Sequence, residues 1–134
     1  MRKALRRLVR ERAGNCCEYC HTPQSATNLP HAIDHVIPQQ HLGPTLEANL
    51  CFACLWCNCY KGPNLSGIDS KTGEMARLFN PRTDSWLEHF HWEGAILVGD
   101  TATGRATISV LAINQADRIA HREMQLELDP ETFS

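Results

Sequence analysis

The chain has 134 residues, enough for one ordinary domain and too few for two, so we expect residues 1–134 to form a single domain. No apolar run reaches the ~18 residues that cross a membrane, and the charged start of the chain does not resemble a secretory signal. We therefore expect a cytoplasmic, intracellular protein. The net charge of −2 is unevenly distributed: residues 1–12 hold six basic side chains and one acidic, a net +5 that leaves −7 for the rest. A basic arm on an acidic body suits binding to a phosphate backbone.

Hydrophobic spacing and turn residues predict the elements of the first half of the chain. An amphipathic helix is expected over residues 3–13, where apolar side chains recur with the spacing of one helix face. The following segments are expected to be a strand over 33–37 ended by Pro38, a strand over 50–53, and a helix from just after Cys54 to Lys61.

The second half contains weaker signals. Residues 62–74 are rich in Gly, Pro, Ser and Asn and are predicted to form a surface loop. The remaining predictions are helical turns over 75–79 and 85–90, a hairpin over 90–98 that turns at Glu93-Gly94, and helices over 101–112 and 115–122. Together these segments predict an α+β protein.

Two cysteine pairs have the spacing of a metal site. Cys17-x-x-Cys20 and Cys54-x-x-Cys57 match a tetrahedral four-thiolate zinc centre, in which each pair occupies one tight turn. Intracellular proteins rarely contain disulfides, and the total of seven cysteines is odd, which argues against a complete disulfide framework. The 33 residues between the pairs indicate a sizeable insertion.

The three other cysteines allow an alternative. Cys51, Cys54 and Cys57 form a C-x2-C-x2-C run typical of iron–sulfur ligands, although Cys59 follows too closely for the familiar ending. An iron–sulfur or thiol redox protein therefore stays open, and an absorption spectrum would detect it. The simpler interpretation is that Cys16, Cys51 and Cys59 are small buried or half-buried residues.

Between the cysteine pairs, Asp34 and His35 lie side by side on the first predicted strand. Neighbours on a strand point to opposite faces, so both can serve one site only where the strand ends or twists. A lone Asp-His pair is a weak signal. It is strengthened by Asn49-Leu50 and by the segment from Cys57-Asn58 to Lys61-Gly62.

In this order the motifs resemble the HNH endonuclease family, whose core is the ββα-metal finger. The matching pieces, within residues 16–62, are Cys17-Glu18-Tyr19-Cys20, Ile33-Asp34-His35-Val36-Ile37-Pro38, Asn49-Leu50 and Cys54-Leu55-Trp56-Cys57-Asn58-Cys59-Tyr60-Lys61-Gly62. The resemblance implies a small ββα core stapled by the zinc site, followed by a C-terminal extension with a hairpin and helices over about 75–134.

The resemblance also implies roles for individual residues. His35 corresponds to the general base that activates water, which suits an imidazole that titrates near neutral pH. Asp34 and Asn58 correspond to the ligands of a divalent metal that stabilises the leaving 3′ oxygen. Asn49 corresponds to the middle Asn, which braces the loop and orients the base. The predicted catalytic set is therefore Asp34, His35, Asn49 and Asn58.

Asn58 stands where other members have His, which makes this an HNN variant with consequences for the metal. Carboxylate and amide oxygens favour Mg2+, with Mn2+ as a substitute, over softer transition metals. The expected cofactors are therefore catalytic Mg2+ or Mn2+ and structural Zn2+. Candidate nucleic-acid contacts are Lys61, Arg6 and Arg10.

The resulting prediction is a metal-dependent endonuclease that acts on DNA, with double-stranded DNA as the expected partner. The alternative is a zinc-stabilised nucleic-acid-binding module without nuclease activity, which would share the cysteines and the basic arm. Asp34, His35 and Asn58 discriminate between the two, because a pure binding module does not need them together. One such site cuts one strand, so cleavage of both strands would require a homodimer or two encounters.

Overall fold

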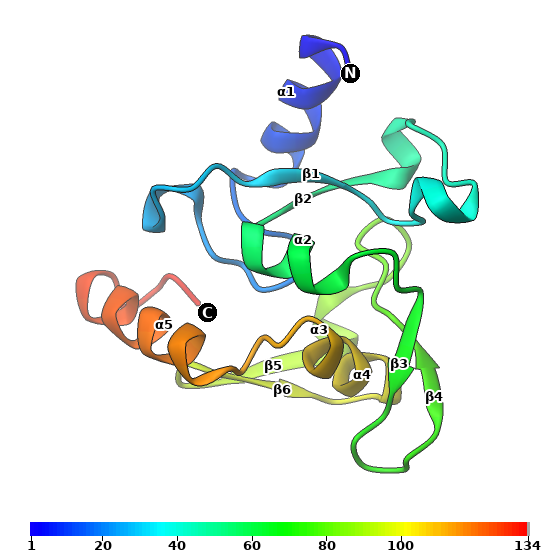
Figure 1. Cartoon of the computed structure of the whole chain (residues 1–134). Coiled ribbons are helices and arrows are strands. Elements are labelled where there is room, and N and C mark those ends of the chain that lie inside the picture. Colours follow the sequence, from blue (N-terminus) through cyan, green and yellow to red (C-terminus); the bar gives the residue numbers. More distant parts are fainter. Residues whose placement is uncertain (134) are drawn as a thin grey trace.

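The computed structural model describes residues 1–133 and combines short helices with small sheets (Figure 1). Within these residues the strands form three two-stranded antiparallel sheets, β1–β2, β3–β4 and β5–β6. The strands are β1 (Ala32–His35), β2 (Leu50–Ala53), β3 (Ser66–Ile68), β4 (Met75–Arg77), β5 (Phe90–Glu93) and β6 (Ile96–Gly99). The helices are α1 (Lys3–Arg12), α2 (Leu55–Lys61), α3 (Trp86–His89), α4 (Ala102–Val110) and α5 (Ala116–Leu128). This mixture confirms the predicted α+β class.

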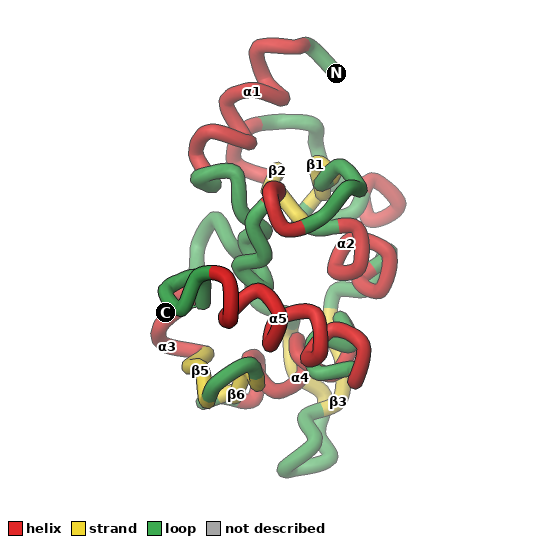
Figure 2. The backbone as a smooth tube through the Cα atoms, turned by 90° about the vertical axis from the view of Figure 1, so that its left-hand side faces the viewer, coloured by secondary structure: helices red, strands yellow, loops and turns green. Residues whose placement is uncertain are grey.

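The β1–β2 hairpin lies between two helices, with α1 on one side and α2 on the other (Figures 1 and 2). The apolar stripe of α1 packs on the hairpin through Val9, which is fully buried against Leu50 and Phe52. After α1 the chain reverses direction through Gly14 and Asn15, which both have a left-handed φ near +60°. This arrangement leaves the basic side chains of α1 on the outside.

The larger core lies on the α2 side of the hairpin. It joins the four cysteines of the two pairs to aromatic and aliphatic side chains from the C-terminal half, among them Phe79, Phe90, Leu97 and Leu111. In Figure 1 the β5–β6 hairpin and helices α3 and α4 lie below α2, and α5 lies to one side. The C-terminal extension thus packs directly on the cysteine-rich core.

Two local predictions for the middle of the chain are wrong. The expected surface loop over 62–74 and helical turn over 75–79 instead contribute the strands β3 and β4. These strands are three residues long, too short to give a clear period. Their hairpin is held by a distant residue, because Arg105 on α4 donates to the buried carboxylate of Asp69 at 2.7 Å.

The other predicted elements are confirmed, with small changes at their ends. Helix α5 continues to Leu128, six residues beyond the predicted end. The β5–β6 hairpin turns at Gly94, which has a φ of +63°. Among residues 1–133, none of the helices combines the length and the apolar character needed to cross a bilayer.

Candidate functional site

The four cysteines of the two pairs converge on one buried point. Their Sγ atoms lie within 4.8 Å of one another, and Cys17, Cys20, Cys54 and Cys57 are each at most 1% exposed. The two pairs have matching turns: the Cys20 amide donates to Cys17 Sγ at 3.5 Å, and the Cys57 amide to Cys54 Sγ at 3.4 Å. The latter bond also caps the N-terminus of α2.

This geometry is compatible with structural zinc. Four sulfurs bound to one Zn2+ at about 2.3 Å lie about 3.8 Å apart on a tetrahedron. The Sγ atoms of Cys20 and Cys54 are 3.7 Å apart. Of the remaining cysteines, Cys51 is buried and Cys16 half-buried as expected, whereas Cys59 is exposed on α2, so that expectation was wrong.

Asp34 and His35 extend to opposite faces of the β1–β2 hairpin. Asp34 pairs with Cys51 across the hairpin and faces the large core, where it is only 6% exposed. His35 pairs with Leu50, whose side chain is packed under α1. Directly opposed residues of an antiparallel pair share a face, so His35 emerges on the α1 side. His35 is also the last residue of β1, where the strand ends.

The Asp34 carboxylate is the centre of a buried polar cluster. Its Oδ2 accepts a hydrogen bond from the Tyr19 hydroxyl at 2.9 Å and lies 3.2 Å from the Lys61 ammonium. The Cys51 thiol lies 3.5 Å from the same oxygen. Burial, reinforced by the electrostatic interactions with Cys51 and Asp34, raises the pKa of Tyr19 well above its usual value. Tyr19 therefore stays protonated and keeps donating to Asp34.

The Lys61 side chain connects the Asp34 cluster to His35. Its ammonium donates to Asp34 Oδ1 at 3.3 Å and to the backbone carbonyl of His35 at 3.0 Å. Because this side chain is 2% exposed, it does not present its charge to solvent as the predicted phosphate contact would. In this structure Lys61 instead joins the last turn of α2 to the end of β1.

Asn58 lies on α2, one turn before Lys61. Residues three apart on a helix share a face, so Asn58 is on the side of α2 from which Lys61 reaches β1. Its side chain is half-buried and makes no hydrogen bond within residues 1–133. Asn58 and Asp34 thus come from facing elements and offer an amide and a carboxylate oxygen.

Asn49 fixes the loop that follows His35. Its amide is buried and accepts a hydrogen bond from the Ile37 amide at 2.9 Å, and donates to the carbonyls of Ile37 at 3.0 Å and Pro44 at 2.9 Å. Gly43 lies so close to this brace that a Cβ there would be 1.6 Å from the Ile37 carbonyl oxygen. The loop therefore has little freedom next to His35.

The His35 imidazole is itself oriented by this loop. Its Nε2 lies 2.9 Å from Thr45 Oγ1, and its Nδ1 has no hydrogen-bond partner in the described part of the chain. The sequence had indicated neither Thr45 nor Tyr19 as a site residue. Tyr19 lies inside the first cysteine motif, which was the available signal, whereas nothing in the sequence indicates Thr45.

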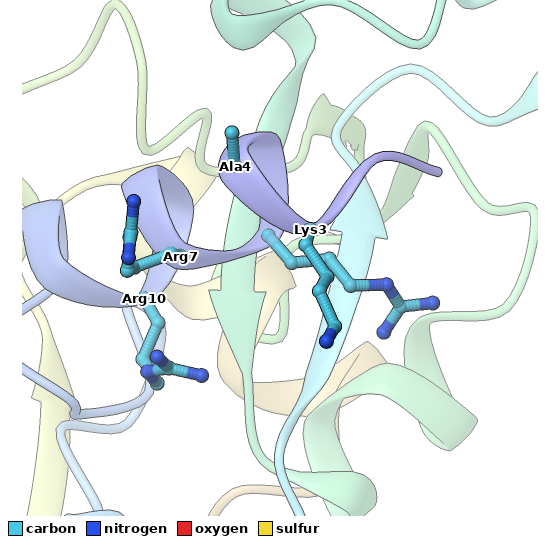
Figure 3. Close-up of a pocket in the computed structure, with 5 residues that line it drawn as sticks. Lys3, Ala4, Arg7 and Arg10 are labelled. Atoms are coloured by element: carbon cyan, nitrogen blue, oxygen red, sulfur yellow. The ribbon is translucent and has the colours of Figure 1, made fainter.

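The basic side chains of α1 stand on the same side of the hairpin as His35. Lys3, Arg6, Arg7 and Arg10 line a surface hollow of about 530 Å³. Figure 3 shows Lys3, Arg7 and Arg10 projecting from α1, with the ribbons of both hairpin strands behind the helix. The predicted contacts Arg6 and Arg10 are thus exposed members of one cationic surface.

Comparisons with known proteins are consistent with the residues that this site brings together. The chain is 29% identical over 117 residues to the Septu protein PtuB of Bacillus thuringiensis, which corresponds to 85% of this chain and 42% of that protein. The chain therefore spans less than half the length of this curated relative. No solved structure gives a significant match. A family model described as HNH endonuclease matches residues 17–63, the segment from the first cysteine of the four-cysteine cluster to two residues beyond the end of α2. This match confirms the predicted resemblance: residues 17–63 of this chain match the family model of the HNH endonucleases.

Proposed function

We propose that the protein is a metal-dependent endonuclease that hydrolyses phosphodiester bonds of double-stranded DNA, with His35 as general base. The observation that carries the proposal is the position of His35. It lies at the end of β1, its ring is oriented by Thr45, its loop is braced by Asn49, and the surrounding segment matches the HNH family. The HNH match supports a nuclease in general, and the particular chemistry is inferred from these residues.

The contacts of His35 suit proton transfer from water. We assign the Nε2 proton to the hydrogen bond with Thr45, which leaves the lone pair of Nδ1 available. A neutral imidazole of this tautomer accepts the proton of an attacking water at Nδ1. The carbonyl of His35 is meanwhile held by Lys61, which keeps the backbone of the base in place.

Asp34 and Asn58 are the proposed metal ligands. Their oxygens fit a hard cation such as Mg2+, with water completing the coordination. When bound, such an ion neutralises the phosphoryl oxygens and stabilises the leaving 3′ oxygen. In this structure the charge of Lys61 neutralises Asp34. A metal ion would therefore have to replace one of the present contacts of the Asp34 carboxylate.

The substrate surface is proposed to be the α1 side of the hairpin. Lys3, Arg6, Arg7 and Arg10 form a cationic track on the face from which His35 emerges. Phosphates on both sides of the scissile bond can be held there by charge without reading the base sequence. A single such site cuts one strand, so cleavage of both strands requires a second copy or a second encounter.

One observation favours the alternative of a nucleic-acid-binding module without nuclease activity. Asp34 is buried and both of its oxygens are engaged, by Tyr19 and Lys61. In this alternative, the Asp34 carboxylate stabilises the core and binds no metal. The two proposals share the cationic surface and differ in whether Asp34 and Asn58 bind metal.

Cleavage of nucleic acid by an Asn58→Ala variant distinguishes the nuclease from the binding module. Labelled duplex DNA, single-stranded DNA and RNA are incubated with Mg2+, Mn2+ or EDTA, and Asn64→Ala in the exposed segment after α2 serves as the matched control. We expect metal-dependent cleavage of the duplex by the wild type and the control, and its loss in Asn58→Ala with DNA binding retained. Binding by all three proteins without any cleavage would support the binding module.

A further inference from the structure

Helix α5 carries two buried arginines that have no carboxylate partner among residues 1–133. Arg118 is 2% exposed and Arg122 is 1% exposed. Within residues 1–133, every ion pair to Asp or Glu involves other cations. Because arginine is always charged and is seldom fully buried unless paired, these two charges need another counter-ion.

For Arg118 the counter-ion is the four-cysteine cluster. Its Nη2 lies 3.0 Å from Cys57 Sγ and 3.8 Å from Cys54 Sγ. The guanidinium is held in this position by a hydrogen bond from Nη1 to the Leu111 carbonyl at 2.6 Å and by the ring of Trp56, whose centroid is 5.6 Å away. With a divalent metal bound, the cysteines are deprotonated, and Cys57 is then the nearest anionic partner of this guanidinium.

Arg122 follows one helical turn later, on the same face of α5. It donates from Nε to the Ala95 carbonyl at 2.7 Å and from Nη2 to Asn114 Oδ1 at 3.1 Å, and its guanidinium lies 5.5 Å from the Trp92 ring centroid. These neutral acceptors engage Nε and Nη2 but carry no charge that would cancel that of the guanidinium.

The charges of the helix and the cluster match. Four thiolates around one divalent ion have a net charge of −2, and burying that charge without compensation is costly. Arg118 and Arg122 supply +2. A cluster with protonated thiols or a trivalent ion would leave the two arginines partly unbalanced.

We propose that α5 is the electrostatic partner of the metal centre: Arg118 donates directly to Cys57, Arg122 acts through space, and retention of the metal depends on both. This assigns a role to the C-terminal extension, since α5 lies outside the segment that matches the family. The proposal concerns only the four-cysteine site and does not depend on nuclease activity.

The test is the rate at which zinc leaves the protein. Zinc-loaded full-length protein is mixed with the chromophoric chelator 4-(2-pyridylazo)resorcinol, and zinc release is followed by absorbance. We expect Arg118→Met, which keeps the apolar volume and removes the charge, to release zinc at least about tenfold faster than the wild type, as for other outer groups that support metal ligands. Arg122→Met should release zinc faster than the wild type, but by a smaller factor. Arg118→Lys should fall between the wild type and Arg118→Met.

Two further measurements separate charge from packing. Arg77→Met, which removes an exposed arginine paired with Asp84, should retain zinc like the wild type. In Co2+-loaded protein, removal of the N–H donor in Arg118→Met should shift the thiolate-to-cobalt absorption band to longer wavelength, which a packing defect alone would not do. If Arg118→Met does not fold, the zinc-release rates of Arg118→Lys and Arg122→Met test the proposal. Wild-type release rates in folded Arg118 variants, or an unshifted cobalt band, would overturn the proposal.

Discussion

At the scale of single residues, the ion pair between Lys61 and Asp34 determines the character of the site. Both side chains are nearly inaccessible, at 2% and 8% exposure, and they join the end of α2 to the strand that carries His35. A buried pair of this kind is sensitive to the loss of one partner, because the remaining charge has neither water nor a counter-ion.

We predict that Lys61→Met lowers the free energy of unfolding by about 3 kcal/mol, because it strands the Asp34 carboxylate in the core. The measurement is urea-induced unfolding of the zinc-loaded proteins. Lys71→Met is the matched control, because Lys71 is exposed on the β3–β4 turn, and it should unfold like the wild type. An unchanged midpoint for Lys61→Met would show that Lys61 is not the partner that Asp34 requires.

Residues of the site differ in how far the sequence predicts them. The four cysteines, His35, Asn49 and Asn58 could be predicted because their spacing is a local signal within a linked set of motifs. The burial of Lys61 was not predicted, because a lysine one turn after Asn58 has the same pattern whether it faces solvent or β1. Its partners lie 26 and 27 residues away and are set by tertiary packing.

At the scale of elements, the β3–β4 hairpin shows where local patterns fail. Its strands are too short to show a hydrophobic period. Gly67 lies so close to α4 that a Cβ at this position would be 2.3 Å from Val110 Cγ2. The hairpin is thus defined by packing on α4 and by the ion pair between Asp69 and Arg105. By contrast, β1, β2 and α2 were predicted because Pro38, Cys54 and Gly62 mark their ends locally.

We predict that the Asp69 carboxylate stabilises the β3–β4 hairpin at neutral pH and that this stabilisation is lost in acid. Arg105, followed by the Lys71 amide and the Thr72 hydroxyl, holds the pKa of Asp69 well below its usual value, although burial opposes this. A carboxyl group whose pKa is lowered on folding stabilises the fold above its unfolded pKa of about 3.9, and this contribution is lost as the pH falls through the folded value.

The comparison is between the wild type and Asp69→Asn, by thermal unfolding from pH 7 to pH 3. The wild type should have the higher midpoint at pH 7, and the difference should shrink as the pH falls below about 4. A difference that does not change with pH would mean that the Asp69 side chain acts through its shape and hydrogen bonds rather than its charge.

At the scale of the whole molecule, charge is separated between α1 and the rest. Residues 1–12 have a net charge of +5 in a chain of −2, and α1 forms one end of the structure (Figure 1). In the proposed function, the acidic body limits nonspecific coating of nucleic acid and directs a phosphate backbone to the α1 side. This is the side from which His35 emerges.

We predict that Arg6→Gln/Arg10→Gln weakens DNA binding and makes it less sensitive to salt. Each lost phosphate contact should reduce the slope of log K against log salt concentration by about 0.9. The measurement is fluorescence anisotropy of a labelled duplex over a range of salt concentrations. Lys71→Gln, on the turn at the opposite end of the molecule, should leave the slope unchanged (Figure 1). An unchanged slope in the double variant would remove α1 from the proposed substrate surface.

The proposed function depends on His35 as the general base of a metal-dependent nuclease. Its most direct test is supercoiled-plasmid cleavage by the wild type and His35→Ala, each with Mg2+ and with EDTA, with the zinc content of both proteins measured to confirm that the core is intact. We expect Mg2+-dependent nicking by the wild type and a loss of at least about a hundredfold in His35→Ala, the scale of a missing general base. Equal cleavage by both zinc-loaded proteins would contradict the proposed function.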